Sequence, residues 1–169
     1  MLFFTMRFVV IAMDSTQYRD AVVANRREHG FEAVDEYTGG FDPVWEIRDD
    51  DDPSVGECAV LATLVDDPEL APDDIAATAD EFRDVLVERV DGRQRATTPL
   101  GYVVFAVPDP DQSLVGAARS YTVARGRTNV FPLVYDCAAE QLYRHEVPRL
   151  KGRGIYRRQV DDAERLFEL

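Results

Sequence analysis

The spacing of apolar residues along the chain predicts three full helices and one short terminal helix. In the second of them Ile75, Ala79, Phe82 and Leu86 recur every three or four residues, the period of a helix face that packs on a core. A glycine follows each of the three longer helices, where a left-handed residue commonly ends a helix. The predicted helices cover residues 17–29, 73–89, 113–125 and 160–167.

Alternating or continuous apolar runs predict the strands. Residues 44–48 alternate strictly, which predicts a strand with one solvated face, whereas residues 101–107 are apolar throughout, which predicts burial on both faces. Asp49 to Gly56 separates two such runs and is predicted to form the turn of a hairpin. The predicted strands cover residues 8–13, 31–37, 44–48, 57–65, 101–107, 130–135 and 141–144.

This order of elements predicts an α/β protein, with α+β as the alternative class, built on a single mixed sheet flanked by about three helices. From residue 17 to residue 135 it resembles the restriction-endonuclease-like fold of PD-(D/E)xK nucleases. Counted from residue 8, it is instead the order of a ferredoxin-like sheet with one inserted strand, and the sequence leaves both topologies open. We divide the chain into an α/β core domain, residues 1–142, and a basic C-terminal arm with a short terminal helix, residues 143–169.

Acidic residues strongly outnumber basic ones. The 169 residues include 32 Asp and Glu against 19 Lys and Arg, a net charge of −13, and Lys151 is the single lysine. This composition resembles that of proteins from extreme halophiles, in which concentrated salt screens repulsion between surface charges. The apolar run at the start is shorter than the ~20 residues that span a bilayer and has no cleavage site. We therefore expect a cytoplasmic protein, translated from Met1 or from Met6.

Positive charge is concentrated near the C-terminus. Residues 113–158 hold nine bases and three acids, whereas residues 1–112 hold nine bases and 25 acids. Tyrosines and glycines interleave with the bases of residues 143–158, as in surfaces that stack nucleic-acid bases and hold phosphates. The same segment suits neutralisation of the protein's own acidic face, or docking on a second subunit. The predicted anion- or partner-binding residues are Arg119, Arg125, Arg127, Tyr143, Arg144, Arg149, Lys151, Arg153, Tyr156, Arg157 and Arg158.

The resemblance to PD-(D/E)xK nucleases implies a different site. In that family, acidic residues of the hairpin strands hold Mg²⁺ and a lysine steadies the attacking water. The matching segment offers Asp42, Glu46 and Glu57 as metal candidates but has no acid-x-Lys motif. The resemblance therefore implies a metal-dependent phosphodiesterase fold or its inactive nucleic-acid-binding relative.

The remaining candidates for chemistry have simpler interpretations. Asp109 and Asp136 each follow an apolar strand, which places them at the edge of a sheet where ligands bind and where they would form a carboxylate pair. The alternative is that Asp109 and Asp111 start turns or cap the next helix. Cys58 and Cys137 lack metal-binding spacing and are expected to be reduced and buried, although a disulfide between them stays open. Asp49 to Asp52 is expected to be a solvated acidic turn.

Taken together, these patterns favour a non-enzymatic binding or assembly protein that uses the basic C-terminal segment. We expect a homo-oligomer, with nucleic acid or another phosphorylated ligand as the alternative partner and no membrane partner. No cofactor is expected, and Mg²⁺ enters only under the nuclease-like alternative.

Overall fold

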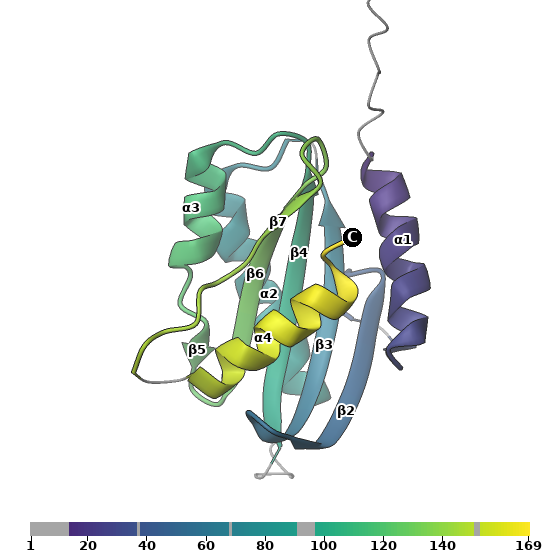
Figure 1. The fold of residues 1–169 in the computed structure, drawn as a ribbon, viewed down its shortest axis with the longest axis vertical. Helices are drawn as coiled ribbons and strands as arrows, with labels where there is room; N and C mark the ends of the chain where they lie inside the picture. The colour runs from purple at the N-terminus through teal and green to yellow at the C-terminus, as the bar shows by residue number, and fades with distance from the viewer. Residues whose placement is uncertain (1–13, 37, 68, 91–96, 151–152) are drawn as a thin grey trace, which may run out of the picture.

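Seven strands form one mixed sheet in the part of the chain that the structure describes (Figure 1). This computed structural model describes residues 14–36, 38–67, 69–90, 97–150 and 153–169. The strands are β1 (Glu32–Ala33), β2 (Val44–Asp52), β3 (Gly56–Asp66), β4 (Thr98–Val107), β5 (Ala124–Arg125), β6 (Thr128–Asp136) and β7 (Gln141–Tyr143). The helices are α1 (Ser15–Glu28), α2 (Pro72–Arg89), α3 (Gln112–Ser120) and α4 (Arg153–Leu166).

The strands follow the order β1-β2-β3-β4-β6, and β5 and β7 both pair with the outer edge of β6. β2 and β3 form an antiparallel hairpin, whereas β3, β4 and β6 are parallel and are joined through α2 and α3. The α/β class with a mixed sheet is therefore confirmed. The assignment to a restriction-endonuclease-like or ferredoxin-like topology stays a prediction, and the strand predicted over residues 8–13 lies outside the described residues.

The sheet is covered on both faces, with α1 and α4 on one side and α2 and α3 on the other (Figure 1). Alternate residues of β4 show the division: Tyr102 and Val104 pack with the α1 and α4 side, whereas Val103 and Phe105 pack with the α2 and α3 side. Burial on both faces explains why the parallel strands read as continuous apolar runs. In the described part of the chain, none of the helices combines the length and the apolarity that crossing a membrane requires.

Three predicted elements before residue 130 have different bounds in the structure. The hairpin turn is shorter than predicted, because β2 continues to Asp52, whose carboxylate accepts hydrogen bonds from the backbone N–H groups of Ser54 and Val55. The third helix ends at Ser120 rather than near residue 125. There Arg83 of α2 donates to the backbone carbonyls of residues 122 and 123, and holds that segment in an extended course toward β5. The strand predicted over residues 31–37 is reduced to β1, whose two residues are exposed.

The terminal helix is also longer than predicted, since α4 begins at Arg153 instead of residue 160. Its first turn lies against the β2–β3 turn, where a Cβ atom at Gly154 would overlap the carbonyl oxygen of Ser54. Glycine therefore permits this close approach. As a consequence, the C-terminal part of the predicted basic arm is helical and packs on the sheet of its own chain.

Candidate binding surface and groove

Several of the predicted binding residues lie around the outer edge of β6: Arg125 on β5, Tyr143 on β7, and Tyr156, whose ring packs on Phe131 of β6 (Figure 1). α3 joins this region because Arg119 contacts Tyr143 of β7. Lys151 lies outside the described residues. Of the others, Arg119, Arg125, Arg127, Arg149, Arg153 and Arg157 are exposed, Tyr143, Arg144 and Tyr156 are half-buried, and Arg158 is buried.

Some of these arginines are neutralised by the protein itself. Arg125 lies 3.2 Å from Asp80, and Arg144 lies 3.7 Å from Glu168. Among the residues that the structure describes, no carboxylate lies within ion-pair distance of a further set of exposed arginines. That set is Arg119 on α3, and Arg149, Arg153 and Arg157 in and before α4.

We call Arg149, Arg153 and Arg157 the basic surface. Arg153 and Arg157 are one turn apart at the N-terminal end of α4, and the first turn of that helix contains no acidic residue. The N-terminus of a helix already carries partial positive charge from its free N–H groups. Arginines at this position add to the local positive potential instead of compensating it.

Arg158 is different, because its guanidinium is buried in an ionic cluster beneath α4. Its Nε donates to Asp162 at 2.9 Å, and its Nη1 donates to Asp49 at 2.6 Å and to Asp52 at 3.0 Å. The hydroxyl of Tyr102 donates to the same Asp162 oxygen at 2.7 Å. Arg158 was predicted to bind a ligand, but this geometry leaves it no room to do so. It neutralises the protein's own acids.

Burial and pairing shift the pKa values of this cluster in opposite directions. Burial raises the pKa of Asp162, and the facing Arg158 only partly opposes that shift. For Arg158, burial alone would lower the pKa, but the carboxylates of Asp162 and Asp49 raise it above its ordinary value. The hydrogen bond from Arg158 lowers the pKa of Asp49, which lies nearer the surface. The cluster therefore fastens α4 to β2 and β4 with charged hydrogen bonds.

His145, which also belongs to the predicted basic segment, covers the outer edge of β6. Pro132 has no N–H to offer a partner strand, and its carbonyl lies 3.1 Å from Nε2 of His145. The side chain of Gln159 bonds both the N–H and the carbonyl of His145. Burial lowers the pKa of His145, so this residue is neutral at physiological pH and belongs to the core.

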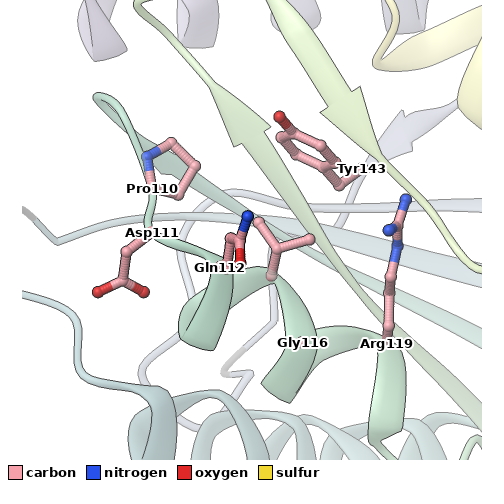
Figure 2. A pocket seen from close by; sticks show the side chains of 7 residues that line it. Pro110, Asp111, Gln112, Gly116, Arg119 and Tyr143 are labelled. Atoms are coloured by element: carbon pink, nitrogen blue, oxygen red, sulfur yellow. The ribbon is translucent and has the colours of Figure 1, made fainter.

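A groove of about 400 Å³ separates α3 from β7 (Figure 2). Gln112, Gly116 and Arg119 recur at helical spacing on the face of α3 that borders it, and Tyr143 of β7 faces them. The guanidinium carbon of Arg119 lies 5.5 Å from the centre of the Tyr143 ring, within the range of a cation–π contact. The complete lining is Pro110, Asp111, Gln112, Val115, Gly116, Arg119 and Tyr143.

The metal candidates of the nuclease-like alternative do not converge. Glu46 faces Leu61 across the hairpin, four residues along β3 from Glu57, which corresponds to about 13 Å. Glu46 is engaged by Arg89 at 2.6 Å, and Glu57 accepts from Thr97 at 2.7 Å. Asp42 is exposed. Across the described ranges, no group of three or more His, Cys, Asp or Glu side chains could hold a metal ion.

Asp136 organises turns at the carboxyl ends of β4 and β6. One of its oxygens, Oδ1, accepts from the N–H groups of Asp109, Ala138 and Ala139 at 2.9–3.1 Å. Asp109 holds a positive φ of 47°, a conformation that this contact stabilises. Asp136 therefore caps turns instead of pairing with Asp109, and Asp111 caps α3 by accepting from the N–H of Leu114, in agreement with the helix-cap interpretation.

Both cysteine thiols are buried. Cys58 and Cys137 are free thiols, so no disulfide joins them, and burial raises the pKa of each to about 11. Such thiols are almost entirely protonated at neutral pH and react slowly. The remaining histidine, His29, caps the C-terminal end of α1 at the surface.

Of the seven groove residues, only Arg119 and Tyr143 were predicted as part of a site, and the other five, including Gln112 and Gly116, were missed. A usable signal was present, because Gln112, Gly116 and Arg119 follow the i, i+4, i+7 pattern of one helix face. A glycine in the middle of a helix is a second signal, because it destabilises the helix and the helical backbone does not require it there.

The comparisons with known proteins add no assignment. The chain matches no family model, no curated protein is significantly similar to it, and no solved structure is significantly similar either.

Proposed function

We propose that the protein is a non-enzymatic binding protein that holds single-stranded nucleic acid on its basic surface. The observation that carries this proposal is the placement of exposed arginines, free of carboxylate partners among the described residues, at the N-terminal end of α4 in a chain of net charge −13. Cations at that end of a helix are unfavourable for the helix itself. A phosphate group removes that penalty, because the guanidinium fork and the helix N-terminus both favour it.

The path of the C-terminal segment supports a ligand-binding surface over an arm that docks on a second subunit. His145 lies against the edge of β6, where its Nε2 is 3.1 Å from the carbonyl oxygen of Pro132. α4 is then held by Arg158 and Gln159. What this segment leaves exposed is the three arginines of the basic surface, Arg149, Arg153 and Arg157, whereas Tyr143 and Tyr156 are half-buried. Exposed arginines without carboxylate partners suit a polyanion.

Binding rather than catalysis is supported by the state of the reactive groups. Glu46 and Glu57 are about 13 Å apart along the hairpin and each is hydrogen-bonded to a protein group. Both thiols and His145 are buried. The nuclease-like alternative would need carboxylates that meet at one point, and these do not.

The test is the salt dependence of binding to a labelled single-stranded oligonucleotide, followed by fluorescence anisotropy in molar KCl. For single strands, log K falls with log salt by about 0.7 for each phosphate contact. Replacing Arg153 and Arg157 by glutamine should therefore reduce the slope by about 1.4. The matched control replaces Arg27 and Arg165, which are exposed at the C-terminal ends of α1 and α4, and should leave the slope unchanged.

Two results would overturn the proposal. Equal slopes and affinities in the two double variants would show that net charge, and not the basic surface, governs binding. Loss of an oligomer in the Arg153/Arg157 variant, measured by light scattering without any nucleic acid present, would assign the surface to self-association instead.

A further inference from the structure

Gly116 stands in the middle of the nine-residue helix α3, where glycine disfavours the helix. The surroundings do not demand it, because a Cβ atom at this position would meet nothing within 4 Å and Gly116 shows no positive φ. What a side chain would change is the groove, since Gly116 lines it and is exposed (Figure 2). The missing side chain leaves a flat stretch of helix backbone that a planar group can approach.

The two ends of the groove carry opposite charge. Arg119 and Asp111 are eight residues apart on α3, which corresponds to about 12 Å along the helix axis. Asp111 is exposed at one end of the groove, and its Oδ1 accepts from the N–H of Leu114 and the hydroxyl of Ser113. The hydrogen bond from Ser113 lowers the pKa of Asp111, so its carboxylate is ionised at neutral pH.

The groups between these ends suit a flat, polar ring. Tyr143 supplies an aromatic face, and Gln112 supplies an amide that both donates and accepts. Arg119 is held against the Tyr143 ring and keeps its guanidinium fork available, because no carboxylate pairs with it in the described part of the chain. An anion bound there would contact a cation whose position is already fixed.

We infer that this groove is a subsite for one nucleotide, with the base lying over Gly116 beside Tyr143 and the phosphate on Arg119. The inference rests on the proposed function and deepens it, because it assigns one nucleotide of the bound strand to a defined place. The acidic end selects the orientation: Asp111 accepts from the amino group of a base and repels a phosphate. Bases with an exocyclic amino group, such as guanine, should therefore bind better than uracil.

The experiment measures binding of GMP, UMP and a single-stranded oligonucleotide by calorimetry in molar KCl. Gly116→Leu fills the groove and should weaken GMP binding about tenfold or more, the scale of one base–aromatic contact. Ser120→Leu places the same side chain at the exposed last residue of α3, outside the groove, and should bind GMP as the parent does. Asp111→Asn keeps the helix cap and should reduce the preference for GMP over UMP.

The outcomes separate this inference from the proposed function. Loss of GMP binding in Gly116→Leu but not in Ser120→Leu supports the subsite, whether or not the oligonucleotide binds. If the oligonucleotide binds Gly116→Leu and the parent equally, and neither protein binds GMP, the subsite is overturned. The proposal that the basic surface binds nucleic acid is then unaffected. Absence of binding of both probes overturns both. A circular-dichroism melt checks that each variant is folded.

Discussion

Arg157 and Arg158 are neighbours in the sequence and carry the same charge, yet they lie in opposite environments. Arg157 is exposed at the N-terminal end of α4 with no carboxylate partner among the described residues. Arg158 is 2% exposed and contacts the carboxylates of Asp49, Asp52 and Asp162. One belongs to the outer surface of the helix and the other to its inner face.

This difference teaches that a count of charges along a segment cannot separate binding residues from structural ones. Adjacent residues on a helix point about 100° apart, so one turn of helix divides a basic cluster between solvent and core. The inner arginine offsets buried acids, and without them its burial would be costly. The outer arginines have no such role and are available to a ligand.

Replacing each arginine by alanine should produce the largest contrast. Arg158→Ala leaves Asp162 as a buried charge without its partner, and should lower the free energy of unfolding by about 3–5 kcal/mol. Arg157→Ala removes an exposed side chain and should change it by no more than about 0.5 kcal/mol. Urea unfolding in molar KCl measures both, and comparable losses in the two variants would show that Arg158 is not the residue that fastens α4.

The elements that were predicted best are those whose local pattern agrees with their packing. α2 was predicted almost to the residue, because its apolar spacing matches the face that packs on Val103 and Phe105. β4 was recognised because burial on both faces leaves a continuous apolar run. The errors at the ends of β2 and α3 have long-range causes: Arg158 holds the end of β2, and Arg83 holds residues 122 and 123.

The candidate site was predicted only in part, for a related reason. Arg119 and Tyr143 were both predicted, but their contact depends on how α3 packs against β7 across the sheet edge. The groove also needs Gly116, whose contribution is the absence of a side chain. The loss of Arg158 from the predicted site follows from the early start of α4, which sets the helix phase and could not be derived from a segment dominated by charge.

Asp49 offers a second, smaller contrast within the ionic cluster. Its pKa is lowered in the folded protein, so the stability that it contributes is complete above about pH 4, the ordinary range of Asp, and is lost as the pH falls through the folded value. Asp49→Asn should therefore be less stable than the parent at neutral pH, by about 1 kcal/mol for this partly exposed pair. The pKa of Asp162 is raised instead, so its contribution to the free energy of unfolding changes with pH in the opposite direction.

The measurement is urea unfolding of the parent and the Asp49→Asn variant at a series of pH values, in one concentration of KCl. Because Asp162 is present in both proteins, its contribution largely cancels in the difference. The gap should close as the pH falls below about 4. A gap that stays constant across this range would mean that Asp49 acts through packing and not through its charge.

The smallest expected effect tests the outer arginines directly. Replacing Arg153 and Arg157 by glutamine removes two cations from the positive end of α4, and should raise the free energy of unfolding by about 0.3–1 kcal/mol. Arg165→Gln removes a cation from the negative end of the same helix, and should lower it by a similar amount per charge. Salt screens both effects, so unfolding is measured at the lowest KCl concentration at which the protein is folded.

Opposite signs within one helix would show that Arg153 and Arg157 are held at a cost to the fold, as residues reserved for an anionic ligand should be. A loss of stability in both variants would mean that these arginines make stabilising contacts of their own, and the basic surface would then need no ligand to explain it.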